Sequence, residues 1–293
     1  METKKKKIGF ILNPYAGIGG KAGLKGSDNY KKIEKLLLEG CERTAPKRAE
    51  SCMSKIADLT TSLVAGDKGL VGEKNFSILS APGDMGEALL EKLKIPCDVV
   101  LCPKAHTSSA EDTKLCAQIM KEQGVDLLVF CGGDGTARDI CEAVGTDVTV
   151  LGIPAGVKMY SACYACNPYQ AGEMLAGWLE GKEMSYEMRE VLDIEEKDLD
   201  SRNVSPQLYG FLEVLSDGKH LQKAKELDLG SGESATIIAR AAILRMEKDW
   251  VYIIGPGGTT WKIKELLCEN DEQEDTGKKN AHGTVRGVDV IRN

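Results

Sequence analysis

The stretch that decides the fold is residues 125–136, which reads VDLLVFCGGDGT. Its first seven residues are apolar except for Asp126, a composition typical of a central parallel strand that is buried on both faces. Adjacent glycines end this strand, and a helical pattern begins near Thr136. A buried strand that leads through a glycine turn into a helix predicts an α/β protein built on a parallel sheet.

Strand and helix patterns alternate on both sides of this segment. Short apolar runs predict strands at residues 8–12, 75–79, 98–101 and 148–153. Amphipathic stripes predict helices at 28–39, 85–93, 108–124 and 168–181, and Ser108 with Glu111 has the pattern of a capping box. We expect residues 1–181 to form one α/β domain that binds its ligand at the carboxyl ends of the strands.

Residues 182–293 have a different pattern. Alternating side chains predict strands at 184–194 and 207–215, and a helix at 234–246, a strand at 250–254 and a polar loop at 269–281 follow. The chain ends on the strand-like run TVRGVDVI. We expect these residues to form a second, β-rich, substrate-binding domain that looks incomplete.

Composition excludes several classes of partner. The chain has 293 residues, 42% hydrophobic content, a net charge of −7 and a pI of about 5.3, so bulk electrostatics disfavour nucleic acid and anionic membranes. No apolar run reaches a membrane-spanning length, and the N-terminus lacks the apolar core of a secretory signal. Ten cysteines stand largely in apolar segments, which predicts reduced thiols in the cytoplasm. Small molecules are the expected partners, and a homo-oligomer stays open.

One cysteine pair, Cys163 and Cys166 in CYAC, has motif spacing. A structural zinc site needs a second pair or nearby histidines, and the three histidines of the chain are scattered. We therefore expect a reduced, metal-free pair on a buried helix, and no metal site built from protein ligands alone.

The candidate catalytic segment is Gly132-Gly133-Asp134-Gly135-Thr136. Glycines let backbone amides approach phosphate oxygens because no Cβ blocks them, and a helix start adds a positive end. The carboxylate of Asp134 can accept the proton of an attacking alcohol or hold a magnesium ion that bridges phosphates. In the alternative interpretation, Asp134 only caps the helix. We expect Asp134→Asn to abolish phosphoryl transfer while leaving folding largely intact.

Two further loops follow predicted strands and are candidates for the same site. The loop after residues 8–12 offers Asn13, Gly17, Gly19 and Gly20, but lacks the glycine and hydroxyl positions of a Walker loop. The loop after residues 148–153 offers Gly156 and Lys158. The alternative interpretation of the first loop is a flexible glycine turn, and that of Lys158 is a surface lysine.

Two more features have both a functional and a capping interpretation. Arg138 can neutralise phosphate charge, and Asp139 can act in the site or complete a capping box. The segment GPGGTT at 255–260 can bind phosphate or start a helix.

The motifs NPYAGIGG, FCGGDGTARDI, GIPAGVKMYSACYA, EVLDIEE, LYGFLEV and GPGGTT, in this order, resemble the ATP-NAD kinase-like family, including its acetoin-catabolism relatives. The resemblance covers essentially the whole chain. It implies a two-domain kinase with ATP, Mg²⁺ and the 2′-hydroxyl of NAD as reactants, and NADP as product. By position it makes Asp134 the central aspartate, Asn13 the first-strand asparagine, and the phosphate loop Gly132, Gly133, Gly135 and Thr136.

The chain departs from the family pattern in two places. The later Asn-Glu pair of better-characterised NAD kinases is absent, and residues 137–139 differ from the usual sequence. A lipid kinase of the diacylglycerol or sphingoid-base type is one alternative, although such kinases usually have threonine where Val157 stands. A nucleotide-binding regulator without turnover is the other.

Overall fold

The fold is described from a computed structural model, which defines residues 5–18, 35, 37–38, 40–64, 76–101, 108–156, 159–193, 206–222, 233–255, 258–271 and 289–292. The chain divides into two compact units, Met1–Lys225 and Glu226–Asn293. Each unit is described by itself.

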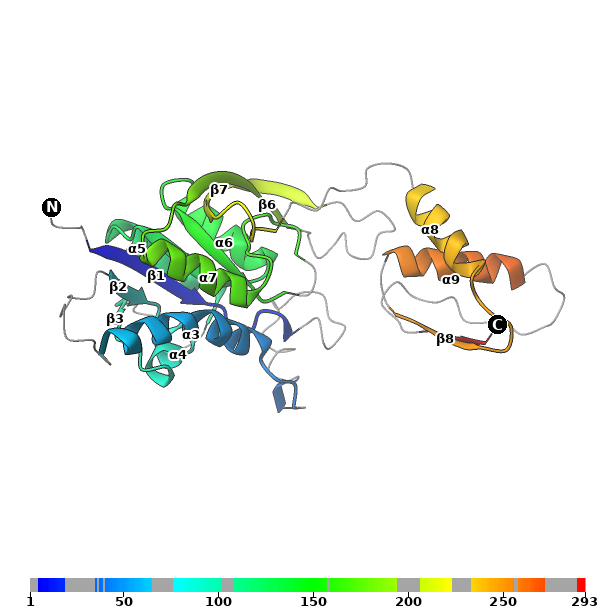
Figure 1. Ribbon diagram of the computed structural model, residues 1–293, viewed down its shortest axis with the longest axis horizontal. Helices are drawn as coiled ribbons and strands as arrows, with labels where there is room; N and C mark the ends of the chain where they lie inside the picture. Colours follow the sequence, from blue (N-terminus) through cyan, green and yellow to red (C-terminus); the bar gives the residue numbers. More distant parts are fainter. Residues whose placement is uncertain are drawn as a thin grey trace. The chain divides into compact units, whose positions relative to one another are not determined.

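Seven strands form one sheet within the described part of the first unit (Figure 1). The strands are β1 (Lys6–Leu12), β2 (Phe76–Ser80), β3 (Asp98–Val99), β4 (Leu127–Gly132), β5 (Val150–Pro154), β6 (Ser185–Asp193) and β7 (Gln207–Ser216). Their order across the sheet is β3-β2-β1-β4-β5-β7-β6. All neighbouring pairs are parallel except β6 with β7.

The order of the strands reverses between β1 and β4. From β1 the chain proceeds to β2 and β3 on one side, and from β4 it proceeds to β5 on the other. The register pairs Ile8 with Leu127 and Leu12 with Cys131, so the carboxyl ends of β1 and β4 lie beside each other. In open α/β sheets, such a reversal leaves a crevice where ligands bind.

Helices cover both faces of this sheet (Figure 1). They are α3 (Thr44–Val64), α4 (Glu87–Lys92), α5 (Ala110–Glu122), α6 (Asp134–Val144) and α7 (Pro168–Leu179), with a 3₁₀ turn η1 at Gly83–Met85. Helix α3 packs against α7, and α5 packs against α6. A Cβ on Gly9 would lie 2.9 Å from the Met120 sulfur of α5, whereas the Phe10 ring lies against Gly86 at the start of α4. Because successive strand residues point to opposite faces, α5 and α4 cover opposite sides.

The central strand is the most deeply buried element. Every residue from Leu127 to Cys131 is 0% exposed. The predicted strand at 125–131, its glycine turn and its following helix are therefore all present. Helix α7 begins at Pro168, as the sequence predicts, and Asn167 caps it by accepting the Gln170 N–H.

Three local predictions need correction. The capping box of α5 uses Ser109 and Asp112 rather than Ser108 and Glu111, since the helix begins at Ala110. Residues 161–166 are extended rather than helical, and they bridge β5 at Gly152. Helix α3 is absent from the predictions, and the predicted helix at 28–39 falls largely outside the described residues.

The expected domain boundary at 181/182 does not coincide with the division between the compact units. Strand β7 pairs with β5 through Val150 and Val214, and β6 pairs with β7 along its whole length. These two C-terminal strands therefore extend the first sheet, and the compact unit continues to Lys225.

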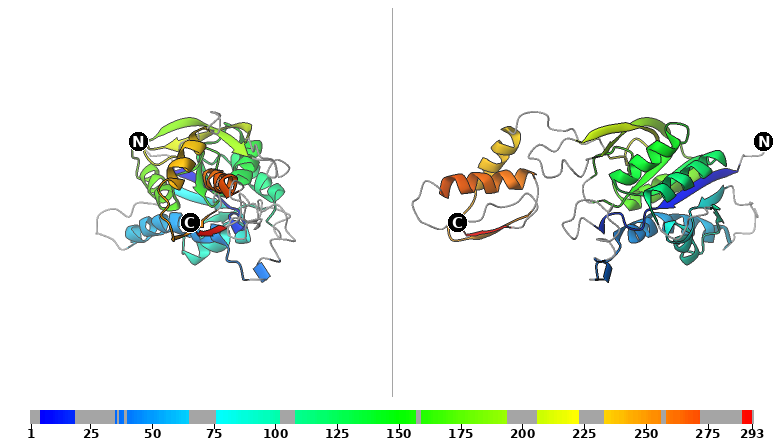
Figure 2. Two further views of the ribbon diagram at one scale, coloured as in Figure 1. Left: turned by 90° about the vertical axis from the view of Figure 1, so that its right-hand side faces the viewer. Right: turned by 180° about the vertical axis from the view of Figure 1, so that it is seen from behind.

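The described part of the second unit contains α8 (Glu233–Ile243), β8 (Val251–Ile254), α9 (Gly258–Asp271) and β9 (Asp289–Arg292) (Figure 2). Strands β8 and β9 pair antiparallel, and α8 packs against α9. The helix at 234–246 and the strand at 250–254 were expected. Helix α9 begins at Gly258, within GPGGTT, which agrees with the helix-start interpretation of that segment. Most of the predicted polar loop at 269–281 lies outside the described residues.

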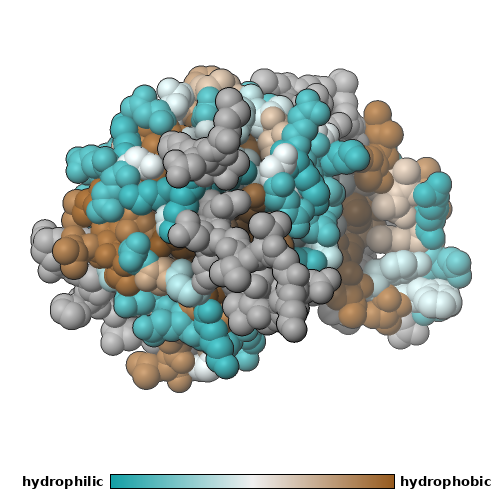
Figure 3. Space-filling view, turned by 60° about the vertical axis from the view of Figure 1, so that its left-hand side comes forward, coloured by the Kyte–Doolittle hydropathy of each residue, from teal (hydrophilic) through white to brown (hydrophobic). Residues whose placement is uncertain are grey.

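Within the described residues, no helix is both long enough and apolar enough to cross a membrane. On the face drawn in Figure 3, hydrophilic side chains alternate with hydrophobic patches. Several large apolar side chains of the β6–β7 pair are exposed, namely Tyr186, Met188, Leu208 and Phe211.

Candidate phosphate-binding site

The loops that follow β1 and β4 lie side by side, as the sequence predicts. The Asn13 backbone N–H donates to the Cys131 carbonyl at 2.9 Å, and the Asn13 side-chain amide donates to the Thr136 hydroxyl at 3.0 Å. The amide oxygen of Asn13 accepts the Tyr15 N–H at 3.1 Å. Asn13 thus joins its own loop to the first turn of α6.

The glycines after β4 have different structural roles. A Cβ on Gly132 would lie 2.3 Å from the Thr136 Cβ, so only glycine allows this close packing. Among the described residues, a Cβ on Gly133 would meet nothing within 4 Å, and one on Gly135 would meet only the ends of side chains at 3.8 Å or more. The described residues therefore leave room beside Gly133 and Gly135 at the start of α6. The first N–H groups of a helix have no carbonyl one turn earlier, and they favour anions.

The loop after β5 packs against both of the others. The Ala155 N–H donates to the Gly132 carbonyl at 2.8 Å, and a Cβ on Gly156 would lie 3.7 Å from the Gly133 Cα. Gly17 has φ +81°, and a Cβ there would lie 2.2 Å from the Ala155 carbonyl oxygen. Three glycine loops thus converge at the point where the strand order reverses.

Asp134, the first residue of α6, is 8% exposed and joins two loops. Its two carboxylate oxygens accept the backbone N–H groups of Tyr160 at 2.8 Å and Ser161 at 2.9 Å. Burial raises the pKa of Asp134, and these two hydrogen bonds act in the opposite direction. Each carboxylate oxygen keeps a further lone pair, so the group can still accept a proton or a donor.

The next positively charged candidate, Arg138, is already paired. Its guanidinium donates to Asp193 at 3.0 Å and lies over the Tyr209 ring at 5.5 Å. Asp139 is 7% exposed, and one of its oxygens is 4.0 Å from the Arg138 Nε. Asp193, the last residue of β6, was not predicted as a site residue, although the sequence places it at the end of an alternating run.

Two hydroxyl groups near Asp134 were also missed. The fully buried Tyr164 donates its hydroxyl to the Gly133 carbonyl at 2.6 Å. The Ser161 hydroxyl donates to the Leu192 carbonyl at 2.8 Å and accepts the Leu192 N–H at 3.1 Å. Since these partners are about 30 residues apart, only the tertiary structure brings them together.

The cysteine pair differs from the prediction. Cys163 is fully buried, and burial raises the pKa of its thiol, whereas Cys166 is exposed. The pair therefore does not lie on a buried helix. Three predicted site residues, Gly19, Gly20 and Lys158, lie outside the described residues.

The described residues fit a divalent metal only as a partner of a bound phosphate. No group of three or more histidine, cysteine or acidic side chains is arranged to hold a metal in the part of the chain that the structure describes. Magnesium usually binds one or two carboxylates together with substrate phosphates and water. Asp134 and Asp193 are the carboxylates nearest the open glycines, because Asp193 lies 3.8 Å from a Cβ built on Gly135.

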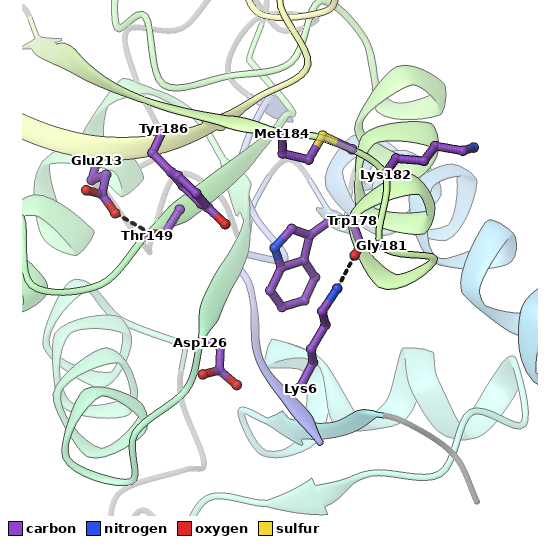
Figure 4. A pocket seen from close by; sticks show the side chains of 9 residues that line it. All are labelled: Lys6, Asp126, Thr149, Trp178, Gly181, Lys182, Met184, Tyr186 and Glu213. Carbon is purple, nitrogen blue, oxygen red and sulfur yellow. Dashed lines mark hydrogen bonds between the residues drawn. The ribbon is translucent and has the colours of Figure 1, made fainter. Parts of the chain in front are cut away.

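A pocket of about 540 Å³ lies at the other edge of the sheet (Figure 4). Its lining includes residues at or just before the starts of β1, β4, β5 and β6, together with Trp178 of α7 and Glu213 of β7: Lys6, Asp126, Thr149, Trp178, Gly181, Lys182, Met184, Tyr186 and Glu213. The lining includes no predicted site residue. We base the candidate site on the converging loops, because their chemistry, rather than a cavity volume, suits a phosphate.

The fold and the loops together define a class: a doubly wound α/β protein whose glycine loops converge where its strand order reverses. A family model described as the ATP-NAD kinase N-terminal domain matches residues 8–183, which is more than half of the chain. The chain belongs to the ATP-NAD kinase family.

Two solved structures from Bacillus anthracis str. Sterne are similar to the chain, the first described as a diacylglycerol kinase and the second as a "putative diacylglycerol kinase". One is 14% identical, covers 63% of this chain and 44% of its own, and has a TM-score of 0.28. The other is 15% identical, covers 64% and 43%, and has a TM-score of 0.29. The matches thus span less than half of those structures. No curated protein matches the chain.

Proposed function

We propose that this protein is an ATP-dependent kinase that phosphorylates the 2′-hydroxyl of NAD to give NADP. The observation that carries the proposal is the convergence of the Asn13, Gly132–Asp134 and Ala155 loops where the strand order reverses, in a chain of the ATP-NAD kinase family. Phosphate oxygens suit the N–H groups of the open glycines, and the helix start stabilises their charge.

In this proposal the phosphate chain of ATP lies against Gly133, Gly135 and the start of α6. A divalent metal, when bound with ATP, neutralises charge on the β- and γ-phosphates. Asp134 accepts the proton of the acceptor hydroxyl as its oxygen attacks the γ-phosphorus, and the bond from that phosphorus to the bridging oxygen breaks to release ADP. Burial suits this role, because it raises the proton affinity of the carboxylate.

The setting we propose is the cytoplasm. Eight described cysteines are free thiols, and several of them are buried, which supports a reducing compartment.

The test incubates the protein with ATP and Mg²⁺ and separately adds NAD, NADH, diacylglycerol or a sphingoid base. We expect NADP, measured with an NADP-specific dehydrogenase, and an equal amount of ADP. Phosphorylation of a lipid in place of NAD would show that NAD is not the phosphate acceptor. ATP that raises the melting temperature without any turnover would instead identify a nucleotide-binding regulator.

A further inference from the structure

Arg48 is an arginine of α3 that lies at the carboxyl edge of the sheet. Its Nη1 donates to the carbonyl of Pro154 at 3.0 Å. Pro154 ends β5 and is paired in register with Gly132, the first glycine of the loop after β4. The Cys131 thiol donates to the Ala45 carbonyl at 3.6 Å, so the first turn of α3 lies over the end of β4.

Arg48 differs from two other arginines of this edge in the charge of its partner. Arg138 pairs with Asp193 at 3.0 Å, and Arg43 pairs with Asp84 at 2.6 Å. Considering only described residues, Arg48 has no carboxylate within 4.0 Å, and its one hydrogen bond goes to a neutral carbonyl. A guanidinium has five N–H donors, and the described residues engage only one of those of Arg48.

The charge of Arg48 also acts on the end of the central strand. Burial raises the pKa of the Cys131 thiol to about 12, and the positive charge of Arg48 opposes this rise. The guanidinium of Arg48 is half-buried. Because water screens its charge less, it attracts an anion more strongly than an exposed guanidinium does.

We propose that Arg48 binds the phosphate chain of the nucleotide, as the cationic counterpart of the glycine loops. The inference rests on the proposed function only in taking the ligand to be a nucleoside polyphosphate. The planar fork of arginine matches two phosphate oxygens at once, whereas the ammonium of lysine acts as a point charge. Arg48 is thus a binding residue, and the proton transfer is left to Asp134.

The rival interpretation is that Arg48 only fastens α3 to β5 through the Pro154 carbonyl. Two substitutions separate these interpretations. Arg48→Gln removes the charge and keeps a side-chain donor for the carbonyl, and Arg48→Lys keeps the charge and loses the fork. Lys47→Gln is the matched control, because Lys47 is the preceding residue of the same helix, is 67% exposed and pairs with Glu42.

The experiment measures binding of inorganic tripolyphosphate, Mg-ATP and adenosine to the full chain by calorimetry at two salt concentrations. We expect Arg48→Gln to weaken tripolyphosphate and Mg-ATP binding at least about tenfold and to leave adenosine binding within about twofold. Arg48→Lys should weaken both polyphosphates by about threefold or more. Lys47→Gln should change no affinity by more than about twofold.

Tripolyphosphate binding to Arg48→Gln within about twofold of wild type would overturn the inference. If that variant does not fold, Arg48→Lys decides the question, and unchanged polyphosphate affinity in it rejects the inference. Arg48-dependent ATP binding without transfer to any acceptor rejects the proposed function and keeps the inference. NADP formation by a fully active Arg48→Gln variant rejects the inference and keeps the proposed function.

Discussion

The two edges of the seven-stranded sheet are built differently. At the amino edge, a pocket of about 540 Å³ is lined by charged and aromatic side chains (Figure 4). At the carboxyl edge, glycine backbones approach so closely that a Cβ on Gly17 would lie 2.2 Å from the Ala155 carbonyl oxygen. The same strands run between both edges, but side chains surround a cavity at one edge and backbones pack closely at the other.

Several polar groups at the amino edge already have partners within the protein. Lys6 donates to the Trp178 carbonyl and lies 4.6 Å from the centre of its ring. Asp126 accepts the Lys7 N–H at 2.7 Å, and Thr149 donates to Glu213. The carboxyl edge instead presents open glycines beside a buried carboxylate. Cavity volume alone would have selected the edge that is less suited to the chemistry.

The largest expected effect is that of Asp134→Asn at the carboxyl edge. We expect kcat to fall by about 10² to 10⁴, because asparagine cannot accept the hydroxyl proton. The structure changes the expectation that folding stays largely intact. An asparagine NH₂ would face the Tyr160 or Ser161 N–H, and one lost acceptor costs about 1–3 kcal/mol of unfolding free energy. Kinetics and urea denaturation measure the two effects.

Asp84→Asn is the control for that substitution, because Asp84 is 61% exposed and pairs with Arg43 at the same edge. We expect this variant to keep kcat within about twofold and stability within about 0.5 kcal/mol. An Asp134→Asn variant that keeps more than about a tenth of wild-type kcat contradicts the role of Asp134 as a base.

The pH dependence of kcat tests the environment of the same carboxylate. Burial raises the pKa of Asp134 above its ordinary value of 3.8, and a base acts only when deprotonated. Activity should therefore fall as the pH drops through this raised pKa, with an acid limb above pH 3.8. An acid limb at or below pH 3.8 would show that burial does not govern this group.

The raised pKa also fixes the sign of the effect on stability. The folded state binds the proton of Asp134 more tightly than the unfolded state does. Its contribution to the unfolding free energy is thus most favourable below pH 3.8 and declines as the pH rises through the folded pKa. Subtracting the urea-denaturation profile of Asp134→Asn from that of the wild type isolates this contribution.

The comparison of edges also shows what the sequence could predict. The strand Leu127–Gly132 and the helix after it were predictable because an apolar run followed by two glycines is a local signal. The meeting of the Asn13 and Gly132 loops was predictable as well, since carboxyl ends of parallel strands share one edge. The family resemblance added the ATP-NAD kinase assignment, which the family model confirms.

Contacts between distant residues were not predictable in this way. The Arg138–Asp193 pair joins residues 55 positions apart, and nothing local in the sequence links them. Helix α3 was missed for another reason. Its buried positions, Ala45, Ala49, Cys52, Met53 and Ile56, do follow a helical period, so the signal for this helix was present in the sequence and was not used. The small residues among them suit close packing of α3 on α7.

A matched pair of glycines compares the two edges directly. Gly17 at the carboxyl edge has φ +81°, and Gly181 at the amino edge has φ +82°. Alanine at either position costs about 1–2 kcal/mol for the left-handed backbone. Only Gly17→Ala also places a Cβ against a carbonyl oxygen, so we expect it to lower the unfolding free energy by about 3 kcal/mol in all. Equal losses in urea denaturation would mean that the carboxyl-edge loops are not tightly packed.

The smallest expected effect is at the amino edge, where Tyr186→Ser should leave kcat/KM for ATP and NAD within about twofold. Tyr186 lines the pocket and is 55% exposed, so its loss should also change stability by less than about 1 kcal/mol. Strand β4 separates Asp126 in the pocket from Gly132 in the loop, and its six residues rise about 20 Å. A substitution that far from the reacting groups can act only by moving the strands. A tenfold fall in kcat/KM with unchanged stability would therefore show that the pocket is coupled to the reaction, and the two edges would have to be treated as one functional unit.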